Sequence, residues 1–199
     1  MTPGGGPPAK GVDLERAAKA VRELLAAVGE DPDRAGLEGT PTRVAEMYAE
    51  LLEGMVNPAE AQLAVTFSAN HDEMVMVKDI PFASLCEHHL LPFIGVAHVA
   101  YIPDPEGTII GISKLARLVD HHAHRLQIQE RLTTEIADTM ERMLQPRGTL
   151  VVLEAEHLCM TIRGVRKPGA RTVTSAVRGL FRRDASTRAE AMAFVRAKS

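Results

Sequence analysis

Two cysteines and several histidines are grouped in a way that suits a metal ion. The segment LCEHHLLP, residues 85 to 92, separates Cys86 from His89 by two residues, and a tight turn of this length presents both side chains to one ion. Cys159 is the other cysteine of the sequence, so we expect it to supply a third ligand. Two thiolates and one imidazole suit zinc. A disulfide is the simpler alternative, but the histidines around both cysteines favour a metal site.

The number of ligands decides what such a site does. Three protein ligands leave a fourth position for water, as in catalytic zinc sites, whereas a structural site has four. His88 and His157 are both candidates for a fourth ligand. Spacing alone leaves the catalytic and the structural site open.

The segment TLVVLEAEHLCMTIRG, residues 149 to 164, predicts a strand that carries part of this site. Side chains on a strand point to the same face at every second residue. We therefore expect His157, Cys159, Thr161 and Arg163 to share one face. A histidine, a metal ligand and an arginine in one row indicate a functional face, because a solvated polar face would not explain Cys159.

His88 lies next to the expected ligand His89. Its ordinary pKa is near neutrality, which suits a proton shuttle beside a metal-activated water. The alternative is that His88 orients a ligand. Glu87 is expected to be structural, because a thiolate zinc site rarely needs a carboxylate.

The remaining histidine group carries a weaker signal. We expect His98 to be a satisfied core histidine on a buried strand. His121 and His124 would lie on one helix face with His122 between them. No cysteine or carboxylate completes a ligand set there, so packing or surface exposure is expected.

A second cluster suits an anion. The segment ISKLAR, residues 112 to 117, opens a predicted helix, with Ser113 as the cap and Lys114 and Arg117 three positions apart. A helix start with two basic side chains is suited to phosphate. Arg163 is the best further candidate from a basic segment that also contains Arg166, Lys167 and Arg171.

Gln129 and Glu130 lie in the first turn of the next predicted helix. A carboxylate in a first turn normally compensates the helix dipole. It becomes functional if a purine is bound, because a carboxylate accepts hydrogen bonds from a pair of guanine N–H groups.

The elements that must position these residues follow in the order helix, helix, strands, helices, strands. Helices are predicted at 14–28, 40–52, 112–126 and 127–146 and from about residue 186, with Asp13 and Thr40 as caps. Strands are predicted at 74–80, 92–104, 149–164 and 171–181. The strand at 92–104 is apolar on both faces and should be covered on both sides, which suggests contact between subunits. The order of elements indicates an α+β fold.

Length and composition limit the classes of protein. The chain has 199 residues, 45% of them hydrophobic and 25% charged, and a formal net charge of -3. This favours a globular domain and argues against nucleic acid as the main partner. No segment is long and apolar enough to span a membrane, and the N-terminus lacks the apolar core of a signal peptide. We expect a cytoplasmic protein with a flexible tail at 1–12 and a single domain at 13–199.

Six segments together resemble the GTP cyclohydrolase I family. They are DPDRAGLEGTPTRVAEMYAEL, SLCEHHLLPFIGVAHVAYIP, GISKLARLVD, QIQERLT, EHLCMTIRGVRKPGA and TSAVRGLF, and they run from about residue 31 to 181. LCEHH, followed by HLC and an arginine four residues after the cysteine, is specific to this family.

The resemblance implies a fold, a reaction and a set of roles. The fold would be the tunnelling fold, an antiparallel sheet with helices on one face at 73–185, preceded by N-terminal helices at 13–54. The assembly would be a homodecamer of two pentamers with sites between subunits. The reaction would convert GTP to 7,8-dihydroneopterin triphosphate and formate, the first step of tetrahydrofolate or pterin biosynthesis. The expected roles are zinc binding by Cys86, His89 and Cys159, catalysis by His88, His157 and Ser113, guanine binding by Gln129 and Glu130, and ribose or triphosphate binding by Ser113, Lys114, Arg117 and Arg163.

One segment departs from the family pattern. Residues 121 to 126 read HHAHRL, where the family usually has aromatic or alanine residues and an Arg-Pro pair. We expect altered packing just before Gln129 and Glu130. The competing functions are a GTP-binding regulatory protein, a tunnelling-fold enzyme acting on a pterin or deazaguanine, and a structural zinc module. The intact Cys-His-Cys set and both histidines argue against the first two, and the third needs a fourth ligand.

Overall fold

The computed structural model describes residues 11–56, 58–59 and 66–197. The chain divides into two compact units, Met1–Asn57 and Pro58–Ser199, which are described separately. Within the described residues, none of the helices combines the length and the apolar character needed to cross a membrane. The expected tail at 1–12 lies largely outside the described residues.

The first unit is a pair of helices, α1 (Leu14–Ala27) and α2 (Thr40–Leu51), followed by the short 3-10 helix η1 (Glu53–Met55). Asp13 caps α1 as predicted, and its carboxylate accepts a hydrogen bond from the backbone N–H of Arg16 at 3.0 Å. The predicted cap at Thr40 is wrong. Gly39 occupies the cap position, and Thr40 and Pro41 form the first turn.

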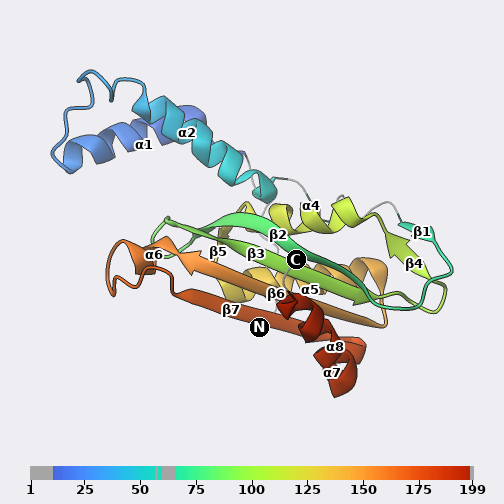
Figure 1. Ribbon diagram of the computed structural model, residues 1–199. Helices are drawn as coiled ribbons and strands as arrows, with labels where there is room; N and C mark the ends of the chain where they lie inside the picture. The colour runs from blue at the N-terminus through green and yellow to red at the C-terminus, as the bar shows by residue number, and fades with distance from the viewer. Residues whose placement is uncertain (1–10, 57, 60–65, 198–199) are drawn as a thin grey trace, which may run out of the picture. The chain divides into compact units, whose positions relative to one another are not determined.

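The second unit contains a five-stranded sheet in the order β5-β2-β3-β6-β7 (Figure 1). Adjacent strands of this sheet pair antiparallel, except that β5 and β2 pair in parallel. A separate pair is formed by β1 (Thr66–Ser68) and β4 (Thr108–Ile110). The strands of the main sheet are β2 (Val75–Cys86), β3 (Pro92–Ile102), β5 (Leu126–Gln127), β6 (Gly148–His157) and β7 (Arg171–Arg178).

Helices α4 (Ile112–Ala123) and α5 (Gln129–Leu144) cover one face of this sheet. Their apolar stripes, which include Leu115 and Ile136, pack against inward-facing residues of β3 and β6 such as Val99 and Leu153. The predicted α+β class is confirmed, but the sheet is mixed and not purely antiparallel, because β5 pairs parallel with β2.

The C-terminal helices α7 (Gly179–Arg183) and α8 (Ala185–Arg196) pack on the opposite face. Phe181 and Ala191 cover Ala100 and Ile102 of β3 there. The chain itself therefore covers both faces of β3 at this end, whereas Ile94 at the other end is 53% exposed. The prediction that β3 is buried on both sides holds for Ala97 to Ile102 only.

Several predicted boundaries are wrong, and the largest error lies near the site. The strand predicted at 149–164 ends at His157, and the chain continues as the short helix α6 (Leu158–Thr161). The strand predicted at 171–181 ends at Arg178, where α7 follows. The helix predicted at 112–126 ends at Ala123, and the next helix begins at Gln129 because β5 intervenes. The strand predicted at 74–80 extends to Cys86, with a bulge between Val77 and Ile80.

Candidate active site

Cys86, His89 and Cys159 come together at one end of the sheet. Cys86 is the last residue of β2, and a turn follows in which the backbone N–H of Leu90 donates to the Cys86 carbonyl at 2.8 Å. This turn presents His89, and α6 supplies Cys159. One ligand atom from each of the three side chains lies within 4.8 Å of the others. The structure thus assembles the three ligands that the sequence predicts.

The chemistry of this cluster fits a metal ion. Both cysteines are free thiols, so the disulfide alternative is wrong for this structure. Burial and the neighbouring Cys86 thiol raise the pKa of Cys159, because two thiolates at this distance repel each other unless a cation lies between them. Two sulfurs and one imidazole are the donor set that zinc prefers. In the described part of the chain, this is the one group of three such ligands that is close enough to hold an ion.

The metal-binding turn is fixed to β5 by Arg131, a residue of α5. Its guanidinium group forms a close ion pair with Glu87 and donates to the Leu126 carbonyl at 2.8 Å. The hydrogen bond from Arg131 lowers the pKa of Glu87. Glu87 is therefore structural, as predicted, and the turn has a tether that sequence spacing did not reveal.

His157 ends β6 directly opposite Phe93 on β3. The two rings are stacked, with centroids 4.7 Å apart and planes 2° from parallel. The Nε2 atom of His157 lies 2.7 Å from Oε1 of Gln129. Burial lowers the pKa of His157, while the charge of Glu130 acts in the opposite direction. A half-buried, neutral imidazole beside the metal cluster suits proton transfer.

Gln129 and Glu130 are adjacent but face different surroundings. The Gln129 side chain is 1% exposed, and its Nε2 lies within hydrogen-bond distance of the Leu153 carbonyl, the Thr172 carbonyl and the Thr174 hydroxyl. The side chain that the sequence assigned to guanine is therefore committed to the sheet and to His157. Glu130 is exposed at the start of α5, so its carboxylate is available to a ligand. It is also close enough to His157 for its negative charge to favour the protonated imidazole.

His88 lies on the outer side of the metal-binding turn. Its side chain is 64% exposed, and its Nε2 is 3.9 Å from the Glu87 carboxylate. Its Nδ1 is 3.9 Å from the sulfur of Cys86. His88 is placed next to the ligands without belonging to the three-residue cluster.

The predicted anion-binding residues come from two separate elements, α4 and the loop after α6. Gly111 is the cap of α4, so the prediction that Ser113 caps this helix is wrong, and Ser113 lies in the first turn. The far end of α4 is the end near the metal cluster, because the Ala123 carbonyl accepts a hydrogen bond from the Ser84 hydroxyl at 2.6 Å. The 12 residues of α4 separate its ends by about 17 Å, at a rise of about 1.5 Å per residue. Figure 1 shows α4 running from the β4 end of the sheet toward β5.

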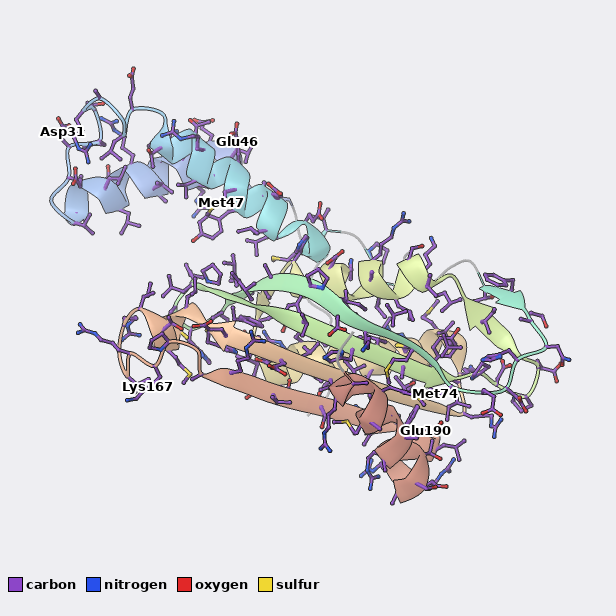
Figure 2. All side chains as sticks on the ribbon, in the orientation of Figure 1. Asp31, Glu46, Met47, Met74, Lys167 and Glu190 are labelled. Atoms are coloured by element: carbon purple, nitrogen blue, oxygen red, sulfur yellow. The ribbon has the colours of Figure 1, made fainter. Side chains whose placement is uncertain are left out.

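Arg163 differs from the residues of α4. It follows α6 and is close enough to Cys159 to lower its pKa, against the larger effects of burial and Cys86. It does not share a strand face with His157, because β6 has already ended. The loop after α6 is tied back by Glu156, whose carboxylate accepts hydrogen bonds from the Thr161 hydroxyl and the Gly169 N–H, both at 2.9 Å. Lys167 marks this loop in Figure 2.

His98, His121 and His122 are buried and serve packing, as predicted. His98 is buried, and its Nδ1 accepts a hydrogen bond from the Asp79 N–H at 3.2 Å. Burial lowers the pKa of His98. His122 is also buried, with its Nε2 3.0 Å from the Thr139 hydroxyl and its Nδ1 3.5 Å from the Glu135 carboxylate. His121 pairs with Arg125.

Three features of the site escaped the sequence analysis: the Phe93 stack, the Arg131 tether and the inward orientation of Gln129. The pairing of Phe93 with His157 depends on strand register. Arg131 and Glu87 are 44 positions apart. The one local signal was the position of Arg131, four residues after Gln127, whose side-chain oxygen it contacts at 2.9 Å.

Comparison with known proteins gives a consistent result. The family described as GTP cyclohydrolase I matches residues 17–196. A Thermobifida fusca protein named GTP cyclohydrolase 1 is 62% identical over 182 residues, which cover 92% of this chain and 88% of that protein. Proteins of the same name from Streptomyces avermitilis and Pelotomaculum thermopropionicum are 60% and 58% identical, each over 94% of this chain and over 92% and 99% of their own lengths.

Proposed function

Because this chain belongs to the GTP cyclohydrolase I family, we propose that it acts on GTP with a zinc ion held by Cys86, His89 and Cys159. The reaction is the hydrolysis and rearrangement of GTP to 7,8-dihydroneopterin triphosphate with release of formate, and the fold is the tunnelling fold of the family. The observation that carries the proposal is the Cys-His-Cys cluster next to His157 at one end of the sheet. When bound, zinc supplies a Lewis acid that lowers the pKa of water and so provides a nucleophile for C8 of guanine.

The remaining steps belong to side chains of this chain. The exposed carboxylate of Glu130 accepts hydrogen bonds from the guanine N–H groups and orients C8 toward the metal cluster. His157 transfers a proton to or from the opening ring, because its half-buried imidazole is neutral and close to the ligands. His88 is the second proton-transferring histidine, from the exposed side of the metal-binding turn. Arg163, next to Cys159, binds the phosphate or ribose side of the substrate.

The working assembly is proposed to be a homo-oligomer, a decamer of two pentamers, with Ser113, Lys114 and Arg117 supplied to each site by another subunit. The support for a shared site is the length of α4, which places Ser113 and Lys114 about 14–15 Å and Arg117 about 9 Å from Ala123 at the metal end of the same chain. Exposed apolar side chains such as Leu24 in α1, Ile94 and Val173 are also consistent with contacts between copies. The single domain at 13–199 and the cytoplasmic location expected from the sequence stay predictions.

The function is tested with purified protein and GTP. Formate release and the fluorescence of the oxidised pterin product report the complete reaction. Activity should disappear when a strong chelator removes the metal and return when zinc is added. A protein that binds GTP and releases no formate would be a regulatory binder, and the proposed reaction would be wrong.

A further inference from the structure

The orientation of the buried Gln129 amide is fixed by its surroundings. Its nitrogen lies 3.2 Å from the Leu153 carbonyl and 3.0 Å from the Thr172 carbonyl. Both are backbone oxygens that only accept hydrogen bonds, so the atom facing them must be the donating NH2 group. A flipped amide would place three oxygens together in a buried site. The oxygen of Gln129 therefore faces His157.

Two threonine hydroxyls reinforce this assignment. Thr133 donates its hydroxyl proton to the backbone carbonyl of Gln129 at 2.6 Å, and its oxygen lies 2.6 Å from the Thr174 hydroxyl. Since the Thr133 proton is already used, the Thr174 hydroxyl donates to Thr133. The Thr174 oxygen is then left as an acceptor for the Gln129 amide at 3.1 Å. Both hydroxyl protons of this cluster are then placed, and the two protons of the Gln129 NH2 group are shared among three acceptors.

The orientation of the amide determines the state of the His157 ring. Gln129 Oε1 can only accept, and His157 Nε2 is 2.7 Å away, so Nε2 carries the proton. In the neutral ring Nδ1 is then the unprotonated nitrogen. The stack on Phe93 fixes the plane of the same ring. The contacts with Gln129 and Phe93 thus fix both the tautomer and the orientation of His157.

We propose that Gln129 is a positioning residue that holds His157 as the Nε2–H tautomer, so that His157 exchanges protons with the substrate through Nδ1 alone. This inference rests on the proposed role of His157 in proton transfer. A proton taken up at Nδ1 gives an imidazolium with both nitrogens protonated, and its transfer to N7 of guanine returns the neutral Nε2–H ring. Gln129 itself neither gains nor loses a proton when His157 takes up a proton or transfers it to guanine.

The kinetic test replaces Gln129 by Met, which keeps the length of the side chain and removes all its hydrogen bonds. We expect kcat to fall by about tenfold to a hundredfold, part of the hundredfold or more that a positioned acid or base contributes. KM for GTP and zinc content should stay within about twofold, because the amide faces the sheet. The matched control is Thr174→Val, which removes one partner of the amide and keeps the contact between Gln129 and His157. It should retain most of kcat.

A double variant separates positioning from general damage. Adding Gln129→Met to His157→Ala should cause no further loss of kcat, because the residue acts through the ring. An increased KM with kcat retained would show instead that Gln129 binds guanine and would overturn the proposal. Independent losses in the double variant would overturn it too.

The tautomer can be observed without any turnover. Nitrogen NMR of protein labelled with 15N in histidine should show His157 with a protonated Nε2 and an unprotonated Nδ1, and His157→Asn identifies its signals. The Gln129→Met protein should show a mixture of tautomers. A protonated Nδ1 in the neutral wild-type ring would overturn the proposal even if the variants fold poorly. Full activity of His157→Ala would instead refute the proposed role of His157 and leave the observed tautomer standing.

Discussion

Gly95 is the position where one added methyl group should disturb both the sheet and the site. It lies on β3 opposite Ala155 of β6, two positions along the strand from the pair of Phe93 and His157. A Cβ atom built on Gly95 would lie 2.0 Å from the Glu154 carbonyl oxygen and 2.7 Å from the Ala155 Cα. These are backbone atoms that cannot rotate away. The Gly95→Ala variant must therefore push β3 and β6 apart.

The expected cost follows from two opposing effects. Overpacking of a well-packed region costs about 1–3 kcal/mol, and the upper end applies because backbone must move. Replacing glycine by alanine also stabilises the folded protein by about 0.4–1 kcal/mol, because it restricts the unfolded chain. The free energy of unfolding should therefore fall by about 2 kcal/mol. Because the separation of the strands also shifts the His157 ring, kcat/KM should fall by about tenfold or more.

Urea unfolding followed by far-UV circular dichroism measures this change, at one fixed protein concentration because an oligomer gains stability by mass action. The matched control is Gly111→Ala, where the nearest atom to the added Cβ is Lys114 Cγ at 3.9 Å. Its unfolding free energy should stay within about 1 kcal/mol of wild type. If Gly95→Ala unfolds at the same urea concentration as wild type, the sheet accommodates the methyl group and the reasoning is wrong.

Three further predictions concern the metal, the histidines and acid stability. Cys86→Ser, His89→Ala and Cys159→Ser should each lose zinc on dialysis, measured by elemental analysis, and a variant that keeps full zinc would remove its residue from the ligand set. His88→Ala and His157→Ala should keep zinc while turnover falls about a hundredfold or more, and zinc loss would instead make the residue a ligand. Burial raises the pKa of Glu135, but His122 and Gln127 outweigh it and lower the pKa. Its contribution to stability is then present above the unfolded value of about 4.3 and is lost as pH falls through the folded pKa, so Glu135→Gln should lose less stability than wild type between about pH 6 and about pH 3.5. An identical acid profile for both proteins would exclude this contribution.

The Cys-His-Cys cluster was predictable because its signal is local. Cys86 and His89 are brought together by one turn, and a thiolate site needed the other cysteine of the chain. The residues around Cys159 show the limit of local patterns. Alternation of apolar residues continues past His157, and neither glycine nor proline marks the end of β6. What ends the strand is the tie from Glu156 to Thr161 and Gly169, which no local pattern encodes.

Gln129 shows the same limit for function. Its place at the start of a helix beside Glu130 suited a guanine-binding residue. Its amide instead meets the Leu153 and Thr172 carbonyls, 24 and 43 positions away along the chain. Which side of a helix start faces a sheet is decided by tertiary packing, since α5 must bury Leu132 and Ile136 against β6. The pattern of residues indicated the neighbourhood of the site, and tertiary packing decided which of the two adjacent polar side chains is buried and which is exposed.

The proposed sharing of the active site between subunits can be tested directly. Lys114 and Arg117 lie about 14 Å and about 9 Å along the axis of α4 from Ala123 at the metal end of their own chain, and in the proposed assembly they serve the site of a neighbouring subunit. Mixed oligomers of Lys114→Ala/Arg117→Ala and His157→Ala chains would then contain intact sites, although each variant alone is nearly inactive.

In that experiment the two variants are co-expressed with different affinity tags, and oligomers carrying both tags are purified. Random assembly of equal amounts should restore about a quarter of the wild-type activity per site, because each site draws one chain from either side of an interface. The control mixes His157→Ala with Cys159→Ser, whose altered residues lie in the same half of the site. No mixture of those two chains can build an intact site, so its activity should stay at the level of the single variants. Absence of recovery in the first mixture would place the anion-binding residues and the metal in one chain and refute the shared site. Recovery in the control would show that His157 and Cys159 of one site come from different chains, which would refute this division of the site.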